Sequence, residues 1–162
     1  MRAIVLAVLA ALPLASHAAA VVNEPSISAD GALQAARAAL DACRKDGQKV
    51  AVSVVDASGR LKAQVRDDGA APHTAEHSFR KAYTALTYRE PSAEVGHRAA
   101  QAKGLTIGPL LLPNMTTAAG GVPVKVDGAI VGAVGVSGTP GSAGGGEHDA
   151  KCAEAGAGAA SK

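Results

Sequence analysis

Two of the five histidines and all three aromatic residues of this chain lie in one segment, Arg66–Tyr88. The histidines are His73 and His77, and the aromatic residues are Phe79, Tyr83 and Tyr88. Imidazole nitrogens ligate iron and zinc, and aromatic rings stack on flat ligands. The segment therefore predicts a ligand or metal site better than any other part of the chain.

Zinc is the first chemistry to consider, because His73 and His77 are four residues apart. We expect Thr74 to be the N-cap of a helix that runs to about Tyr88. His73 would then precede the helix and would not lie over His77. No further ligands follow at a spacing typical of zinc sites. On spacing alone, an ordinary surface or partly buried helix histidine is the simpler interpretation of His77.

The predicted helix has two informative faces. Phe79, Tyr83 and Leu86 fall on one face, which we interpret as ordinary core. His77, Lys81, Thr84 and Tyr88 fall on the other, a polar face that carries groups able to bind a ligand.

Other short motifs predict no chemistry. Ser78–Lys81 matches a Ser-x-x-Lys nucleophile, but its partner motifs are missing. Gly135–Gly138 reads "GVSG", and Thr139 stands where a nucleophile elbow needs glycine. Gly132, Gly135 and Gly138 do not lie between a strand and the start of a following helix, so they do not form the glycine-rich motif of a dinucleotide-binding fold.

The N-terminus predicts export. Residues 1–20 have a positive Arg2, the apolar run "AIVLAVLAALPLA" and small residues suited to cleavage, as in a secretory signal peptide. A membrane-anchoring helix is the alternative, but the apolar run is short for a span. We expect a periplasmic or secreted protein whose residues 21–162 form a single domain. A net charge of +2 with both signs interspersed argues against a nucleic-acid partner.

The helices expected outside the histidine segment can be placed by caps and periodicity. One should run from Ser28, a good N-cap, to Gly47, with a buried stripe that includes Leu33 and Leu40. A shorter helix should begin at Ser92, and a glycine-weakened helix should end the chain. The residues from 104 to 121 have no clear period.

Two hairpins complete the elements. The first joins "KVAVSVVD" to "RLKAQVR", and the second turns at Asp127-Gly128, a type I′ signal between alternating apolar runs. Gly132 and Gly135 in its second strand indicate bulges or close contact with another backbone. Hairpins separated by helices predict an α+β fold with an antiparallel sheet layered by helices.

Cys43 and Cys152 are the only cysteines. In an oxidising compartment they can form a disulfide closing a loop of roughly 110 residues, worth about 4–5 kcal/mol on the chain-entropy model. Two free, buried thiols remain the alternative, because the sequence does not show that the two helices meet.

Four blocks taken in order resemble a known family: "VVDASGRLKAQVRDDGA", "FRKAYTA", "GGVPVKVDGAIVGAVGVSG" and "DAKCAEAG". In combination they resemble the GlcG/HbpS-like haem-binding family over about residues 28–160. The resemblance implies a profilin-like three-layer α/β/α fold around a central antiparallel sheet. It also implies haem or a related small molecule as ligand, self-association, and a sensor kinase or membrane protein as partner. Some members are implied to degrade haem or release its iron.

The resemblance also suggests site residues. The segment "GAAPHTAEHSFRKAYTA" is most like the family's haem-binding segment, with Thr74 as the matching axial ligand and His73 and His77 as nitrogen alternatives. Arg66, Arg80 and Lys81 would supply cations near the haem propionates, and Tyr83 or Tyr88 would stack on the ring or ligate iron. The loop "GSAGGGEHDAKCA" departs from the family's shorter acidic pattern, which puts any role of that loop in doubt.

Haem sensing, buffering or carriage is therefore the expected function. If the protein is an enzyme, we expect it to degrade haem. A weak, exchangeable threonine ligand suits a sensor or carrier better than such an enzyme. An oligomeric module for another small metabolite or metal, without haem activity, is the alternative.

Overall fold

The computed structural model describes residues 22–101, 111–140 and 146–161. Along the chain it contains α1 (Ala29–Lys45), β1 (Ala51–Asp56), β2 (Leu61–Arg66), α2 (His73–Tyr88), α3 (Ser92–Gln101), β3 (Gly121–Val126), β4 (Ala129–Ser137) and α4 (Glu147–Ala160). The predicted signal peptide and part of the connection before β3 lie outside the described residues. No helix among the residues described is long and apolar enough to cross a bilayer.

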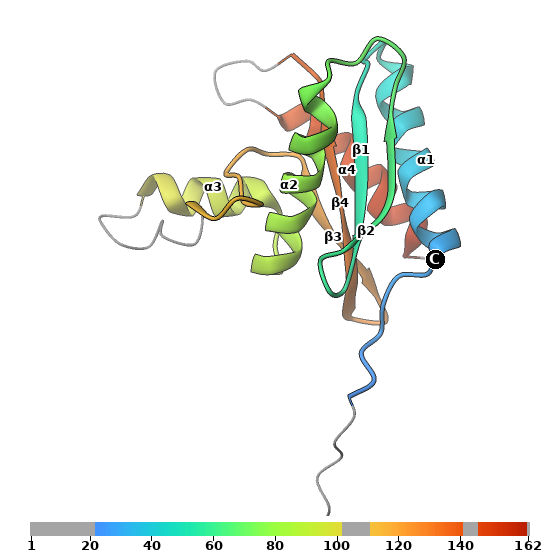
Figure 1. The fold of residues 1–162 in the computed structure, drawn as a ribbon, viewed down its shortest axis with the longest axis vertical. Helices are drawn as coiled ribbons and strands as arrows, with labels where there is room; N and C mark the ends of the chain where they lie inside the picture. The colour runs from blue at the N-terminus through green and yellow to red at the C-terminus, as the bar shows by residue number, and fades with distance from the viewer. Residues whose placement is uncertain (1–21, 102–110, 141–145, 162) are drawn as a thin grey trace, which may run out of the picture.

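The four strands form one antiparallel sheet in the order β2-β1-β4-β3. Helices α1 and α4 pack against each other and cover one face, while α2 covers the other and α3 extends from it (Figure 1). The expected α+β architecture with three layers is confirmed. The second hairpin turns as predicted, with positive φ at both Asp127 and Gly128.

The core between the sheet and α1 with α4 is built from small aliphatic residues, mainly valine and alanine. On α1, Ser28 caps the helix by accepting a hydrogen bond from the Gly31 amide. Leu33, expected in the buried stripe, is 60% exposed, and Ala32, Ala35 and Ala39 are buried instead. The expectation for Leu33 was wrong because alanine lets α1 approach α4 closely, and the bulkier residue lies outside that contact.

Helix α2 packs on the sheet almost backbone to backbone. A Cβ on Gly135 of β4 would lie 2.0 Å from the Ser78 carbonyl oxygen, and one on Gly121 of β3 would lie 2.1 Å from that of Lys81. The predicted close backbone contact at Gly135 is confirmed. Only small side chains fit between such surfaces, so Ala82 and Ala85 form the apolar centre of this contact.

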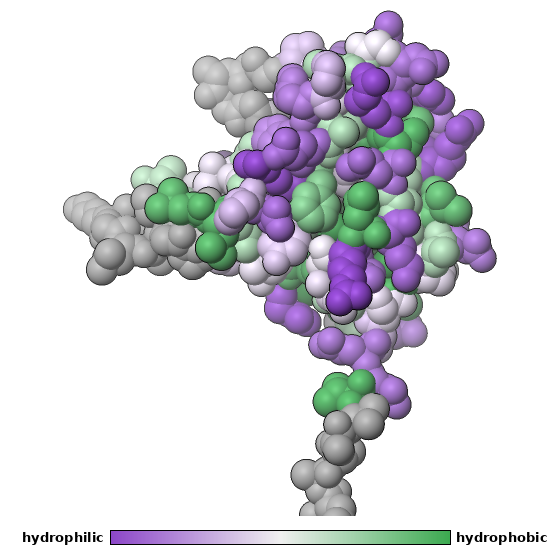
Figure 2. Space-filling model, in the orientation of Figure 1, coloured by the Kyte–Doolittle hydropathy of each residue, from purple (hydrophilic) through white to green (hydrophobic). Residues whose placement is uncertain are grey.

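The faces of α2 differ from the prediction. Of the face expected to be core, which also included Ala75 and Ala82, only Ala82 is fully buried, and Phe79 and Leu86 are partly buried at the edge. The buried residues include Thr74, Lys81 and Thr84 of the face expected to be polar. Figure 2 shows a few apolar side chains gathered on an otherwise largely polar face. Phe79 and Leu86 pack at the edge of the cluster between α2 and the sheet, and Leu61 of β2 is 48% exposed. Size explains the difference, because large side chains do not fit between glycine-lined strands and the helix.

Candidate functional site

One cavity of about 310 Å³ lies where α2 and α4 begin and β4 ends. Side chains and backbone from all three elements and from the segment before β3 line it. The lining residues are Ala71, His73, Thr74, His77, Lys81, Ala118, Ser137, Gly138, Thr139, Gly146 and Asp149. Four of the predicted site residues on α2 therefore line one cavity: His73, Thr74, His77 and Lys81.

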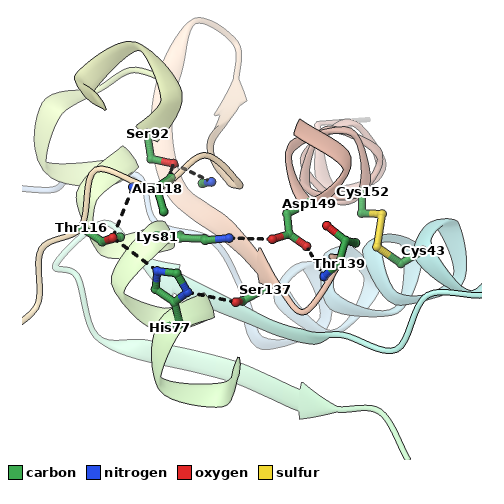
Figure 3. Close-up of polar contacts among 11 residues, drawn as sticks. Cys43, His77, Lys81, Ser92, Thr116, Ala118, Ser137, Thr139, Asp149 and Cys152 are labelled. Atoms are coloured by element: carbon green, nitrogen blue, oxygen red, sulfur yellow. Dashed lines mark hydrogen bonds and ion pairs between the residues drawn. A yellow bond between two sulfur atoms is a disulfide. The ribbon is translucent and has the colours of Figure 1, made fainter. Parts of the chain in front are cut away.

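A buried ion pair forms the inner wall of this cavity. Lys81 Nζ lies 2.7 Å from Asp149 Oδ2, and the two side chains are 3% and 4% exposed. The pair joins α2 to α4 across the end of the sheet (Figure 3). Gly120 makes room for it, since a Cβ there would lie 2.9 Å from the Asp149 Cβ. Burial lowers the pKa of Lys81, and the Asp149 carboxylate acts in the opposite direction.

His77 lies half-buried beside the ion pair. Its Nδ1 is 3.1 Å from Ser137 Oγ at the end of β4, and its Nε2 is 3.4 Å from Thr116 Oγ1 (Figure 3). Desolvation lowers the pKa of His77 below its ordinary 6.5, and the Lys81 charge adds to this effect. The neutral imidazole is therefore the favoured form at neutral pH.

The start of α2 differs from the prediction. The N-cap is Pro72, without a side-chain cap, and His73 is the first helical residue. Thr74 is only 2% exposed, and its hydroxyl donates to the Ala71 carbonyl at 2.7 Å. The expectations that Thr74 caps the helix and that His73 lies off it were both wrong, because proline suits the start of a helix without a side-chain cap.

His73 is exposed at the edge of the cavity. Together with Glu76, His77 and Arg80 it also lines an adjoining shallow hollow of about 240 Å³. Arg80 forms an exposed ion pair with Glu76 one turn earlier. Two imidazoles and the Arg80–Glu76 ion pair thus surround one open surface.

The structure separates the other candidates from this surface. Arg66 donates to the Ala70 carbonyl. Tyr83 packs against Phe79, with ring centroids 5.8 Å apart, and borders a different hollow beside Gly59. The Arg98 guanidinium lies 5.8 Å from the centroid of the Tyr88 ring. Neither tyrosine lines the histidine cavity.

Sequence reasoning missed Thr116, Ser137, Thr139 and Asp149. Ser137, Thr139 and Asp149 line the cavity, and Thr116 contacts His77 at its edge. All four come from segments far from α2 in the sequence, and no spacing rule connects them to it. The departure of "GSAGGGEHDAKCA" from the family pattern was the nearest signal, since this segment contains Asp149.

Within residues 22–101, 111–140 and 146–161, no three His, Cys, Asp or Glu side chains are placed to hold one metal ion. His73 and His77 thus have no third protein ligand of these types in that part of the chain.

Cys43 of α1 and Cys152 of α4 are joined by a disulfide, with their Cα atoms 5.5 Å apart. The bond ties together the two helices on the sheet face opposite α2 (Figure 3).

Comparison with known proteins adds a family to this geometry. The family model described as "Haem degrading protein HbpS-like" matches residues 27–158. Protein GlcG of Escherichia coli K12 is 40% identical over 108 residues, which cover 64% of this chain and 78% of that protein.

Solved structures agree with this match. A double mutant of HbpS from Streptomyces reticuli superposes with a TM-score of 0.76 at 37% identity, covering 92% of this chain and 97% of that one. The structure of a PduOC:haem complex superposes with a TM-score of 0.71 at 27% identity, covering 83% and 94%.

Proposed function

Since this chain belongs to the family of HbpS-like haem-degrading proteins, we propose that it is an exported protein that binds haem and senses, buffers or carries it. The observation that carries the proposal is the open surface at the start of α2. There the exposed His73 imidazole stands beside His77 and Arg80 at the mouth of one cavity.

The donor groups of this surface fit haem. Imidazole is a common axial ligand of haem iron, and a guanidinium suits a propionate. His73 is the axial ligand we favour, because Thr74 is buried and its hydroxyl already donates to Ala71. Bound haem would supply an iron centre able to exchange electrons and bind small diatomic molecules.

The cavity is too small to enclose the whole haem macrocycle. Its 310 Å³ is at the small end of pockets that enclose drug-sized ligands, and large apolar side chains are absent from its described lining. A haem would therefore lie across the opening. We propose that a second copy of the chain covers that opening and supplies an apolar wall, in keeping with the expected self-association. A sensor or membrane partner protein would reach bound haem at the same surface.

An open site favours a carrier or sensor over an enzyme, because haem lying across the opening exchanges with other acceptors. Degradation is tested directly by adding reductant and oxygen to the haem-loaded protein. Loss of the Soret band with release of iron would assign the catalytic function instead.

Export is part of the proposal. Residues 1–20 have the composition of a signal peptide, and the Cys43–Cys152 disulfide suits an oxidising compartment such as the periplasm. Mass spectrometry of the protein recovered outside the cytoplasm should find a chain that begins near residue 21.

Haemin titration tests the proposed function. The purified apo-protein should give a sharpened Soret band that saturates at a fixed ratio of haemin to chain. His73→Ala should shift the band or weaken haemin binding at least ~10-fold. A tenfold loss of affinity corresponds to about 1.4 kcal/mol of binding free energy. Thr74→Val should leave the band in place.

His97 provides the matched control, because it is also a helix histidine but is 74% exposed on α3. His97→Ala should bind haemin like the parent protein. No saturable band would contradict the proposed function, and equal spectra for the parent and His73→Ala would contradict His73 as ligand.

A further inference from the structure

The inner part of the cavity has donor groups that the protein itself does not satisfy. A lysine ammonium has three N–H donors, and the hydrogen bond found for Lys81 within the described residues goes to Asp149 Oδ2. The other Asp149 oxygen accepts from the Thr139 amide at 3.1 Å. The carboxylate is thus engaged through both oxygens, whereas the ammonium has donors to spare.

Thr139 supplies a second donor. Its Oγ1 is buried and has no hydrogen-bond partner among the residues that the structure describes. Leaving a buried hydroxyl without a partner costs free energy, so such groups usually meet a ligand or water. Thr139 lines the same cavity as Lys81.

Two helices begin at this cavity without side-chain caps. Pro72 precedes α2 and Gly146 precedes α4, and neither end has a side-chain hydrogen bond to its first-turn amides. The first-turn amides and the helix dipoles favour negative charge at both ends. A Cβ on Gly146 would lie 2.3 Å from the Ala119 carbonyl oxygen, so glycine at this N-cap also keeps the α4 terminus close to the cavity wall.

From these observations we propose that the inner cavity binds a small carboxylate of a few carbon atoms, held by Lys81 Nζ, Thr139 Oγ1 and the uncapped helix ends. The whole cavity, mouth included, measures about 310 Å³, which is ample for a ligand of that size. Both Asp149 oxygens accept hydrogen bonds, from Lys81 and from the Thr139 amide, so a bound carboxylate would use the remaining Lys81 donors. The inference goes beyond haem binding, since it concerns the inner wall and not the exposed imidazole.

Calorimetry on the purified apo-protein tests the proposal with acetate, lactate and succinate as probes. Their amides have nearly the same shape without the charge, and serve as matched ligands. At least one carboxylate should bind saturably, and its amide at least ~10-fold more weakly, as expected for losing a charge-assisted hydrogen bond. Equal binding of acid and amide overturns the proposal.

Thr139→Val tests the site without disturbing the fold, because the hydroxyl it removes has no partner in the described protein. We expect carboxylate affinity to fall ~10-fold with no loss of thermal stability. Thr87→Val is the control, since the exposed Thr87 hydroxyl bonds the Tyr83 carbonyl on the outer face of α2. It should bind carboxylate like the parent protein.

A haem propionate offers the same chemistry, so haemin and its dimethyl ester form the second arm. Free carboxylates could fail to bind while the ester binds at least ~10-fold more weakly than haemin. If Thr139→Val then weakens the binding of haemin to the same extent, the site holds a propionate. If free carboxylates fail and haemin and ester bind equally, the inference is overturned while haem binding stands. Carboxylate binding without any Soret change would support the inference and contradict the proposed function.

Discussion

At the scale of single residues, His77 makes stability depend on pH. Its pKa is lowered in the folded protein by desolvation first and then by Lys81, His73 and Arg80, while the Asp149 carboxylate acts in the opposite direction. The unfolded chain therefore binds a proton more readily. The stabilisation is fully present above the unfolded pKa of 6.5 and is lost as the pH falls from there through the folded pKa.

Urea unfolding at pH 7.5, 6.5 and 5.5 measures this effect. His77→Asn keeps a polar atom near the Ser137 hydroxyl but does not titrate, so its free energy of unfolding should fall less over this range than that of the parent protein. His97→Asn, at an exposed position, should keep the parent's pH dependence. Parallel curves for the parent and His77→Asn would show that His77 does not cause the decline.

Part of the cavity could be foreseen from residue types, and part could not. His77 and Lys81 are four residues apart, so helical spacing was enough to place them together, whereas His73 was expected to lie off the helix. Ser137 and Asp149 are 60 and 68 residues from the α2 side chains they contact, and no local rule reports such a contact. The tyrosines were misplaced because residue type indicates burial but not which face of a helix is buried.

At the scale of elements, the glycines of α4 explain how it packs on α1. The sequence suggested that they weaken the helix, and this stays a prediction for Gly158, where a Cβ would meet nothing within 4 Å. At Gly156 a Cβ would lie 2.7 Å from the Ala35 carbonyl oxygen and 2.9 Å from the Ala39 Cβ. Gly156 is therefore required for contact between the helices.

The two positions form a matched pair, since alanine brings both the same gain in helix propensity. Gly158→Ala should raise the free energy of unfolding by about 0.5–1 kcal/mol. Gly156→Ala should lower it by about 1–3 kcal/mol through overpacking. Urea unfolding curves measure both changes, and effects of the same sign would contradict the close contact of α1 with α4.

The ion pair between α2 and α4 is a second test at this scale. Lys81→Met would leave the Asp149 carboxylate buried and unpaired, and should cost about 3–5 kcal/mol of unfolding free energy. Lys81→Met with Asp149→Leu removes both charges and should recover most of that loss. Chemical denaturation of the single and double variants measures the coupling between the two side chains. Additive losses would contradict a direct, buried pair.

At the scale of the whole molecule, the fold was predictable because its signals are local. The Asp127-Gly128 turn, the Ser28 cap and the alternation along β2 each act over a few residues, and hairpins separated by helices leave few layered arrangements. The contact of α1 with α4 joins the two ends of the domain. The sequence left the pairing of Cys43 with Cys152 open for that reason.

The disulfide is thus the one covalent link between the beginning and the end of this domain, and it should dominate global stability. It joins residues 109 positions apart, and a loop of that length stabilises the folded state by about 4–5 kcal/mol on the chain-entropy model. Domains commonly have only 5–15 kcal/mol of unfolding free energy, so the reduced protein should be only marginally stable.

Urea unfolding should therefore show a much lower midpoint for the reduced parent and for Cys43→Ala with Cys152→Ala. Reductant should not change the midpoint of that double variant, which separates the lost bond from other effects of the reagent. If the oxidised and reduced parent proteins unfold at the same urea concentration, the domain does not depend on the bond, and the disulfide loses its weight as support for an exported protein.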